Sequence, residues 1–289
     1  MKIIILIPVF NDFKSASKLI KEININISEL KAEFSIIVVN DASTEEKILE
    51  TKNLNNIKSL KLINMRNNKG HARCIAAGLK HISENEDFDY VIPMDGDGED
   101  SPEEISNFVE KIKDNPNNTI VGERVNRSEG LIFKICYFLH KIITYTFTGK
   151  FIKFGNFTCL TKQTVKKLIQ EKATWSSFSG SLAKTESNLI NSPSIRGSRY
   201  FGPSKMSFLN LINHSLAIIA VFKTGVIFRS IAFYAIYLII IAEYISIITA
   251  IPLALIIIFG LVILKISGRE NLNEFNNSLT NISDIDTLK

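Results

Sequence analysis

The chain has 289 residues, 46% of them hydrophobic, which is enough for one large domain with an appendage and a substantial core. With 34 lysines and arginines against 29 aspartates and glutamates, the net charge of +5 favours anionic partners only mildly, and no basic arm or DNA-binding motif points to nucleic acid. Three widely spaced cysteines without a Cys-x-x-Cys pair argue against a disulfide framework and a zinc site, and favour a reducing cytosol.

Four apolar runs in the amino-terminal third each end in a polar loop, as the buried strands of a parallel sheet do. The runs are Lys2–Val9, Phe34–Val39, Leu60–Ile63 and Tyr90–Met94. The first run meets Pro8 well short of a signal peptide with its cleavage site, so it is expected to be a buried strand.

Helical patterns separate these runs. Leu19 and Ile23 recur at helical spacing after the first run, and Ser43 with Glu46 has the capping-box spacing that predicts a helix after the second. A further helix is expected from Ala72 to His81. Strands alternating with helices predict an α/β fold with a doubly wound, mostly parallel sheet, in which ligands bind beyond the carboxyl ends of the strands.

An acidic turn follows the fourth run. Asp95, Asp97, Glu99 and Asp100 stand close together, and the two intervening glycines let the backbone turn tightly. Because crowded carboxylates repel one another, such a cluster is either splayed into water or neutralised by a cation. The turn is therefore a metal site or, alternatively, a solvated cap of the helix that begins near Ser101.

Polar residues also follow the other predicted strands. Asp12 follows the first, Asp41 the second and Lys69 the third. Each of them alone is a common turn or capping residue. Because the carboxyl ends of parallel strands meet at one edge, their joint occurrence with the acidic turn predicts a ligand-binding crevice.

The remaining soluble part continues the pattern. Strands are expected at Asn118–Val121, Gly155–Thr161 and Ser194–Arg199, and helices at Leu131–Thr148 and Lys162–Gln170. The segment from Ala173 to Ser181 mixes polar, small and aromatic residues and is expected to be a mobile loop. The basic segment from Arg199 to Ser207 either presents cations and backbone N–H groups to a phosphate or forms a basic surface loop.

Two apolar segments near the carboxyl end are long enough to cross a membrane. Ile245–Leu264 has no charged residue over the roughly 20 residues that a membrane-spanning helix needs. Val226–Ala242 would also span if Arg229 extends to the interface. Together they predict a helical hairpin that turns near Glu243 and Tyr244, and the alternative is a long, buried pair of core helices.

The residues around the hairpin predict its orientation. Basic residues flank both open ends, so the positive-inside rule places these ends and the soluble domain in the cytoplasm, as in a multi-pass inner-membrane protein. The basic residues are Lys223, Arg229, Lys265 and Arg269. The expected organisation is a soluble domain at 1–207, an interfacial helix at 208–224, two membrane helices at 225–266 and a polar, disordered tail at 267–289.

A series of motifs stands in order along the chain. They are Pro8-Val9-Phe10-Asn11-Asp12, Asn40-Asp41-Ala42-Ser43-Thr44, Asn68-Lys69-Gly70-His71-Ala72-Arg73, Asp95-Gly96-Asp97-Gly98-Glu99-Asp100-Ser101-Pro102-Glu103, Gly122-Glu123-Arg124 with Arg127, and Arg199 with Gly202, Ser204 and Lys205. They resemble the motifs of the family-2 inverting glycosyltransferases, of the polyprenyl-phosphate type similar to dolichyl-phosphate mannose synthase. The resemblance covers Ile3 to Ser207, and it implies a GT-A-like nucleotide-sugar transferase fold.

The resemblance also implies a metal-dependent hexosyltransferase with a UDP- or GDP-linked sugar donor. The donor would be bound by Pro8, Val9, Asp12, Asp41, Lys69, Arg73 and Asp95. Asp41 would accept a hydrogen bond from a base such as uracil. Asp95, Asp97 and Glu99 would hold Mg²⁺ or Mn²⁺, which acts as a Lewis acid on the departing nucleoside diphosphate.

For the acceptor, the resemblance implies the phosphate of a membrane polyprenyl carrier, bound by Arg124, Arg127, Arg199, Ser204 and Lys205. These three arginines and Asp97 would carry the catalysis, with inversion in one in-line displacement. Because a phosphate monoester is already ionised near neutral pH, it needs positioning more than a base, which leaves Asp100 as a bystander or helix cap. The resemblance allows a homo-oligomer without requiring one.

The chain departs from the family pattern at three places. Asn40 replaces the first acid of an Asp-Asp pair, which leaves the donor open, and Glu99 replaces the usual Gln, which adds negative charge to the metal site. Beyond Arg127, only Lys134 represents the family's further basic positions. The alternative activity is transfer to a sugar hydroxyl of a cell-envelope polysaccharide or glycolipid, with Asp100 or a neighbour as base. A purely anchoring protein would leave the motifs unexplained.

Overall fold

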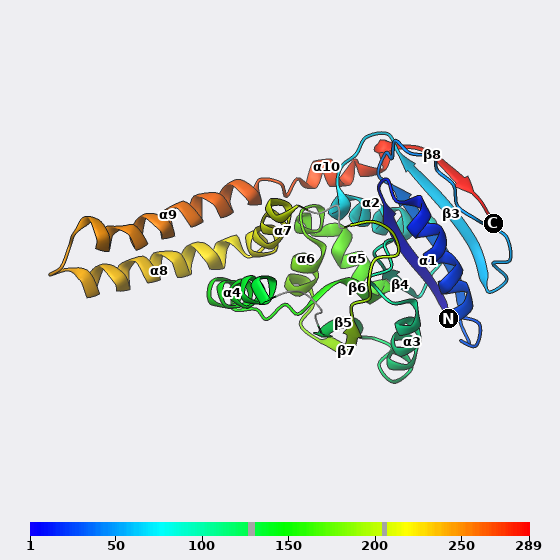
Figure 1. The fold of residues 1–289 in the computed structure, drawn as a ribbon, viewed down its shortest axis with the longest axis horizontal. Helices are drawn as coiled ribbons and strands as arrows, with labels where there is room; N and C mark the ends of the chain where they lie inside the picture. The colour runs from blue at the N-terminus through cyan, green and yellow to red at the C-terminus, as the bar shows by residue number, and fades with distance from the viewer. Residues whose placement is uncertain (127–130, 204–206) are drawn as a thin grey trace.

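The computed structural model describes residues 1–126, 131–203 and 207–289, and shows an α/β domain from which a long helical hairpin extends (Figure 1). One mixed sheet of eight strands has the order β7-β5-β6-β4-β1-β2-β3-β8. The strands are β1 Lys2–Val9, β2 Glu33–Asn40, β3 Ile57–Met65, β4 Tyr90–Pro93, β5 Thr119–Asn126, β6 Phe154–Thr161, β7 Leu189–Ile195 and β8 Ile282–Thr287. The strands β4, β1, β2 and β3 run parallel, as predicted, whereas β6 is antiparallel to both its neighbours and β8 is antiparallel to β3.

Helices cover both faces of the sheet. They are α1 Phe13–Asn26, α2 His71–Asn85, α3 Ile105–Asp114, α4 Leu131–Thr148, α5 Lys162–Gln170, α6 Phe178–Thr185, α7 Phe208–Ala220, α8 Lys223–Ile241, α9 Ile247–Ser267 and α10 Leu272–Asn276, with short 3-10 helices η1 Pro102–Glu104, η2 Lys172–Trp175 and η3 Ser278–Asn281. Buried residues of α1 and α3 pack on one face of the sheet, and those of α2, α5 and α6 pack on the other.

Strand β1 shows why the first apolar run is continuous. Ile5 and Ile7 belong to the core on the α1 side, and Ile4 and Leu6 belong to the core on the α2 side, so both faces of the strand are buried. Helix α2 lies so close to the sheet that a Cβ atom at Gly78 would be 2.5 Å from Cδ1 of Leu6. The central strands are thereby fixed firmly, with their polar loops at one edge.

The helix expected after the second strand is absent, because residues 41–56, all of them described, form an irregular segment. Its polar side chains bind the start of α1 instead. The hydroxyl of Ser43 accepts a hydrogen bond from the backbone N–H of Asn11 at 2.9 Å, and Glu45 accepts one from the N–H of Phe13 at 2.9 Å. Ser43 is therefore not available to cap a helix of its own.

Two further expectations for the soluble part are corrected. The segment from Ala173 to Ser181 is not a mobile loop, because η2 and α6 run through it and bury Trp175 and Phe178 in the core. The last strand of this part lies earlier than expected, at β7, and Arg199 follows it in a loop.

The predicted hairpin is present as α8 and α9, which turn at residues 242–246 and project away from the sheet (Figure 1). Both helices are long and apolar enough to cross a membrane, with mean hydropathies of 2.0 and 3.0. Only 17% and 6% of the most apolar stretches of these two helices are buried, which argues against the alternative of a buried core pair. At the base of the hairpin, Lys223 contacts Glu270 at 3.3 Å, and Arg229 donates a hydrogen bond to the carbonyl of Phe147 at 3.1 Å.

The carboxyl-terminal tail is not disordered, contrary to the sequence-based expectation. After α9 the chain returns to the α/β domain, where α10 lies beside α2 and β8 pairs with β3 (Figure 1). Phe275 is completely buried. The strand β8 covers the edge of β3, which would otherwise expose unpaired backbone groups. Residues on both sides of the hairpin therefore build one sheet.

Candidate active site

The acidic turn lies at the carboxyl end of β4, and its first carboxylate is held by two residues from other elements. Oδ1 of Asp95 lies 3.1 Å from Nε2 of His71, the first residue of α2, and accepts a hydrogen bond at 3.1 Å from Asn156 of β6. Burial opposes charge on both partners, but the mutual attraction lowers the pKa of Asp95 and raises the pKa of His71. The pair is therefore stabilised as carboxylate and imidazolium.

The second carboxylate, Asp97, faces Arg199. The guanidinium of Arg199 donates to Oδ2 of Asp97 at 2.5 Å and to Oδ2 of Asp12 at 2.8 Å. Its Nε is buried without a hydrogen-bond partner among the described residues. Burial and the nearby charge of Asp95 raise the pKa of Asp97. Arg199 is thus the counter-ion of Asp97, whose ionised form is otherwise disfavoured by burial and by the charge of Asp95.

The loop after β7 covers the acidic turn. Gly197 donates its N–H to the carbonyl of Glu99 at 2.8 Å, and Tyr200 donates its N–H to the carbonyl of Asp97 at 2.9 Å. The ring of Tyr200 lies over Gly98, where a Cβ atom would be 2.4 Å from the ring. Arg199 is therefore carried by a loop whose backbone is hydrogen-bonded to the acidic turn.

The third predicted metal ligand, Glu99, pairs with the guanidinium of Arg196. In the part of the chain that the structure describes, no three His, Cys, Asp or Glu side chains are arranged to enclose a metal ion. The structure therefore does not bring Asp95, Asp97 and Glu99 together as a three-carboxylate ligand set.

Asp100 is buried behind the turn, and its Oδ2 accepts a hydrogen bond from the backbone N–H of Asp95 at 3.0 Å. Burial and the charge of Asp95 raise the pKa of Asp100 to about 8. Asp100 holds the backbone of the turn, whereas Ser101, the residue before η1, makes no side-chain cap.

The predicted nucleotide-binding residues at the ends of β1 and β2 lie next to one another. Asp41 donates its N–H to the carbonyl of Val9 at 2.9 Å, and the carbonyl of Pro8 lies beside Gly96 in the acidic turn. The carboxylate of Asp41 is almost fully buried and accepts the backbone N–H groups of Lys69 and Gly70, both at 2.8 Å. Asp41 thus shapes the loop before α2, where Gly70 has a φ of 90°.

The side chains of Lys69 and Arg73 meet on the carboxylate of Glu274 from α10. Nζ of Lys69 lies 3.1 Å from Oε1 of Glu274, and Nη2 of Arg73 lies 3.6 Å from Oε2. The indole N–H of Trp175 donates to Oε2 at 2.9 Å. These contacts join two predicted donor-binding residues to a segment beyond the hairpin.

Of the predicted acceptor residues, Arg124 and Arg199 are described. Arg124 lies beside Gly155, where a Cβ atom would be 2.7 Å from its Nη2. Its positive charge contributes to the lowered pKa of Asp95 and partly opposes the rise in the pKa of Asp100. Arg127, Ser204 and Lys205 lie outside the described residues. Two of the predicted basic side chains therefore approach the acidic turn from different elements.

Sequence reasoning did not single out several residues that contact the site. These are His71, Asn156, Arg196, Tyr200 and Glu274. His71 and Tyr200 fall within or beside the quoted motifs, so the motif positions themselves were the signal for them. Asn156 and Glu274 carry no local signal, because their contacts depend on the pairing of β6 and on the return of the tail.

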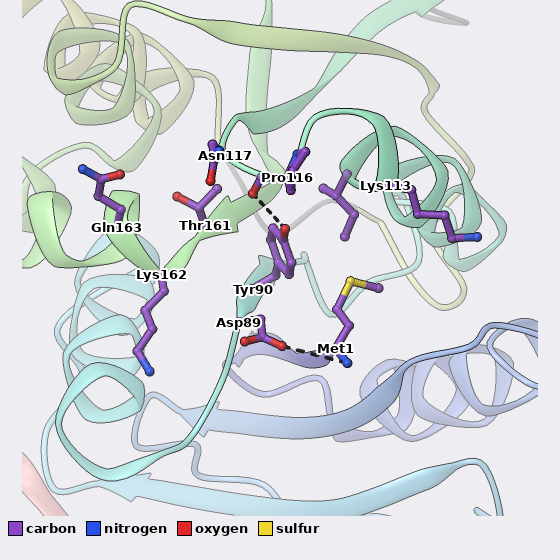
Figure 2. Close-up of a pocket in the computed structure, with 10 residues that line it drawn as sticks. Met1, Asp89, Tyr90, Lys113, Pro116, Asn117, Thr161, Lys162 and Gln163 are labelled. Atoms are coloured by element: carbon purple, nitrogen blue, oxygen red, sulfur yellow. Dashed lines mark hydrogen bonds and ion pairs between the residues drawn. The ribbon is translucent and has the colours of Figure 1, made fainter.

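A pocket of about 520 Å³ lies at the other end of the sheet, near the amino ends of β1 and β4 (Figure 2). Met1, Asp89 and Tyr90 line it, and the hydroxyl of Tyr90 donates to the carbonyl of Pro116 at 2.8 Å. The predicted site residues lie at the carboxyl ends of the strands, so this pocket is separate from them.

Comparison with known families and proteins bears on the site. Residues 4–163 match the family model described as Glycosyl transferase family 2. The chain is 27% identical over 221 residues to undecaprenyl-phosphate 4-deoxy-4-formamido-L-arabinose transferase of Klebsiella pneumoniae (strain 342), and the match covers 73% of this chain and 64% of that protein. The chain thus spans slightly less than two thirds of the length of this relative.

Two solved structures show the same fold. Glucosyl-3-phosphoglycerate synthase from Mycobacterium tuberculosis, with Mn²⁺, UDP-glucose and phosphoglyceric acid, has a TM-score of 0.54 at 11% identity and covers 78% of this chain and 79% of its own. S. aureus TarS 1-349, with UDP-GlcNAc, has a TM-score of 0.50 at 15% identity, with 80% and 70% covered. The expected GT-A-like fold is confirmed by these neighbours.

Proposed function

Because the chain belongs to glycosyl transferase family 2, we propose that it transfers a sugar from a nucleotide donor to a polyprenyl phosphate, with inversion at the anomeric carbon. The observation that carries the proposal is the meeting of Asp95, Asp97, Arg124 and Arg199 at one edge of the sheet, on a chain with an exposed apolar hairpin. The similarity to a transferase named for undecaprenyl phosphate supports the acceptor class.

A divalent cation is the cofactor that the acidic turn suits. Mg²⁺ and Mn²⁺ prefer oxygen ligands, and Mg²⁺ is commonly held by one or two carboxylates together with substrate phosphates. Asp95 and Asp97 supply such oxygens, and the effect of the Asp95 charge on the pKa of Asp97 indicates a repulsion that a cation would relieve. Bound there, the cation would neutralise charge on the departing nucleoside diphosphate. Glu99 would join them only by leaving Arg196.

On the donor side, the buried loops fix the nucleotide and its diphosphate. Pro8, Val9 and Asp12 would line the nucleotide site, and Asp41, which already orders the loop before α2, has further lone pairs to accept a hydrogen bond from the base. Lys69 and Arg73 would bind diphosphate oxygens.

On the acceptor side, the arginines position a phosphate that is already ionised. Its oxygen forms the new bond to the anomeric carbon while the bond to the nucleoside diphosphate breaks, so no proton has to be removed. Arg124 and Arg199 match phosphate oxygens with two-pronged hydrogen bonds. Arg127, Ser204 and Lys205 complete the proposed acceptor set.

The hairpin would hold the site beside its lipid substrate, with the soluble domain on the cytoplasmic face of the inner membrane. Two features support a hairpin whose ends lie on one side of the membrane. Lys223, the first residue of α8, pairs with Glu270 after α9, and β8 pairs with β3 of the soluble domain. The Tyr244→Cys variant should therefore react with a membrane-impermeant thiol reagent that is added to intact cells.

The function is tested by a donor screen with membranes, a divalent cation and undecaprenyl phosphate. One nucleotide sugar is expected to give an acid-labile sugar linked to lipid phosphate. A new glycosidic linkage to a polysaccharide would favour the alternative activity, and no transfer to lipid from any nucleotide sugar would refute the proposal. Asp97→Ala should abolish transfer while the protein stays folded, which separates an enzyme from an anchor.

A further inference from the structure

We propose that Glu274, in the segment that follows the membrane hairpin, is a positioning residue of the donor site. The inference rests on the proposed function, because it assigns Glu274 to Lys69 and Arg73, which would bind the donor diphosphate. It also goes beyond that function, since Glu274 lies outside the family match at residues 4–163. The tail would thus complete a site whose other residues all precede the hairpin.

Glu274 is itself held in place before it contacts either cation. Its N–H is capped by the side chain of Asn271 at 3.0 Å, and its carboxylate accepts the indole N–H of Trp175 at 2.9 Å. The adjacent Phe275 is completely buried and stacks on Trp175 with ring centroids 5.4 Å apart. The hydrogen bond from Trp175 and the two cations lower the pKa of Glu274, so it is a carboxylate at neutral pH.

The two cations are restrained as a consequence. Arg73 contacts both the carboxylate of Glu274 and the ring of Trp175, with its guanidinium carbon 5.2 Å from the ring centroid. Lys69 is fixed at its backbone by Asp41 and at its ammonium by Glu274. Long basic side chains lose rotamer entropy when a ligand orders them, and the contacts with Glu274 restrict Lys69 and Arg73 before the donor binds.

The tail also binds the loop between β3 and α2, here called the donor loop because it carries Lys69, at a second point. The N–H of Arg66 donates to the carbonyl of Asn281 at 2.6 Å, and the side chain of Asn281 donates to the carbonyl of Asn67 at 2.9 Å. The loop between β3 and α2 is therefore bound on one side by Asp41 and on the other by the tail. Lys69, Arg73 and Glu274 keep 34%, 22% and 30% of their side-chain surface exposed, so a diphosphate can still reach the cations.

The test uses Glu274→Gln, which keeps an acceptor for Trp175 but removes the charge. In the full-length protein, the KM for the donor is expected to rise about tenfold, with kcat and the acceptor KM within about twofold of wild type. Glu274→Asp should restore part of the donor affinity. Glu33→Gln is the matched control, because Glu33 forms an exposed ion pair with Lys58 at the opposite end of the sheet.

A second measurement does not depend on transfer. Trp175 is the only tryptophan of the chain, so its emission reports on the contact with Glu274 and can be titrated with inorganic diphosphate and Mg²⁺. Weaker diphosphate binding by Glu274→Gln, at an unchanged melting temperature, supports the inference. Unchanged or tighter binding would overturn it, since the carboxylate of Glu274 would then only hold the tail in place or compete with the ligand. If wild type binds diphosphate but transfers no sugar, the proposed function fails and the role of Glu274 is still decided.

Discussion

Arg199 lies on the carboxylate of Asp97 at 2.5 Å, although the two residues are 102 positions apart in the chain. The same guanidinium binds Asp12, so one arginine neutralises two acids at the ends of β1 and β4. A cation that binds Asp97 has to share this carboxylate with Arg199 or replace it. The proposed acceptor-binding arginine and the proposed metal-binding carboxylate are thereby coupled.

The coupling predicts that Arg199→Gln increases the affinity of the ligand-free protein for Mn²⁺, by about tenfold, because a competing positive charge is removed. The same change should reduce transfer, since the acceptor phosphate loses a guanidinium. Mn²⁺ affinity is measured from the electron paramagnetic resonance signal of the free ion. Lys58→Gln is the control, because it removes a positive charge from an exposed pair with Glu33 at the opposite end of the sheet. An unchanged or lower Mn²⁺ affinity in Arg199→Gln would contradict the coupling.

The different partners of the acidic side chains predict a ranking of metal-site variants. Asp97→Asn should lower kcat by a factor on the order of 100 or more, because charge on the leaving group is no longer balanced. Glu99→Gln should cost less than Asp97→Asn, since Glu99 is paired with Arg196. The measurement is transfer rate against Mn²⁺ concentration for both variants. Equal losses would indicate that Glu99 turns to the metal when substrate binds.

The close approach of Tyr200 to Gly98 predicts that a side chain at position 98 would displace the loop after β7. Gly98 has a φ of 87°, and a Cβ atom there would be 2.4 Å from the ring of Tyr200. Gly98→Ala should displace this ring and with it the loop that carries Arg199, reducing transfer about tenfold and increasing tryptic cleavage at Arg196 and Arg199.

The matched control is Gly202→Ala. Gly202 also has a positive φ, of 68°, but no heavy atom of the described residues lies within 4 Å of the position of its Cβ atom. It should therefore carry only the backbone strain, about 1 kcal/mol, without displacing Tyr200. If both variants lose activity equally, the strain of the loop, and not the contact with Tyr200, is what matters.

The central sheet could be predicted because its information is local. Apolar runs such as Lys2–Val9 mark buried strands, and the carboxyl ends of parallel strands meet at one edge, so Asp12, Asp41 and the acidic turn were expected to converge. The helix predicted from Ser43 failed for a tertiary reason, because Ser43 binds Asn11 of another loop. Capping spacing alone does not reveal such competition.

Contacts between distant segments could not be predicted in this way. Glu274 meets Lys69 across 205 positions, and the tail around it is polar, with too few apolar residues to show a period. Its order comes from pairing with the edge of β3 and from the burial of Phe275. Likewise, the segment that contains Trp175 looks like a loop in sequence but fills the space between α2 and α5, which only the fold defines.

The buried Phe275 gives a last prediction, on the stability of the tail. Phe275→Ala removes a completely buried ring that stacks on Trp175, which should cost about 3 kcal/mol of unfolding free energy and shift the emission of Trp175 to longer wavelength. Phe275→Leu is expected to lose less, because most of the buried volume remains. Thermal unfolding in detergent, followed by tryptophan emission, measures both effects. If Phe275→Ala unfolds like wild type, the tail is not held through its apolar contact, and β8 alone would have to keep Glu274 against the donor loop.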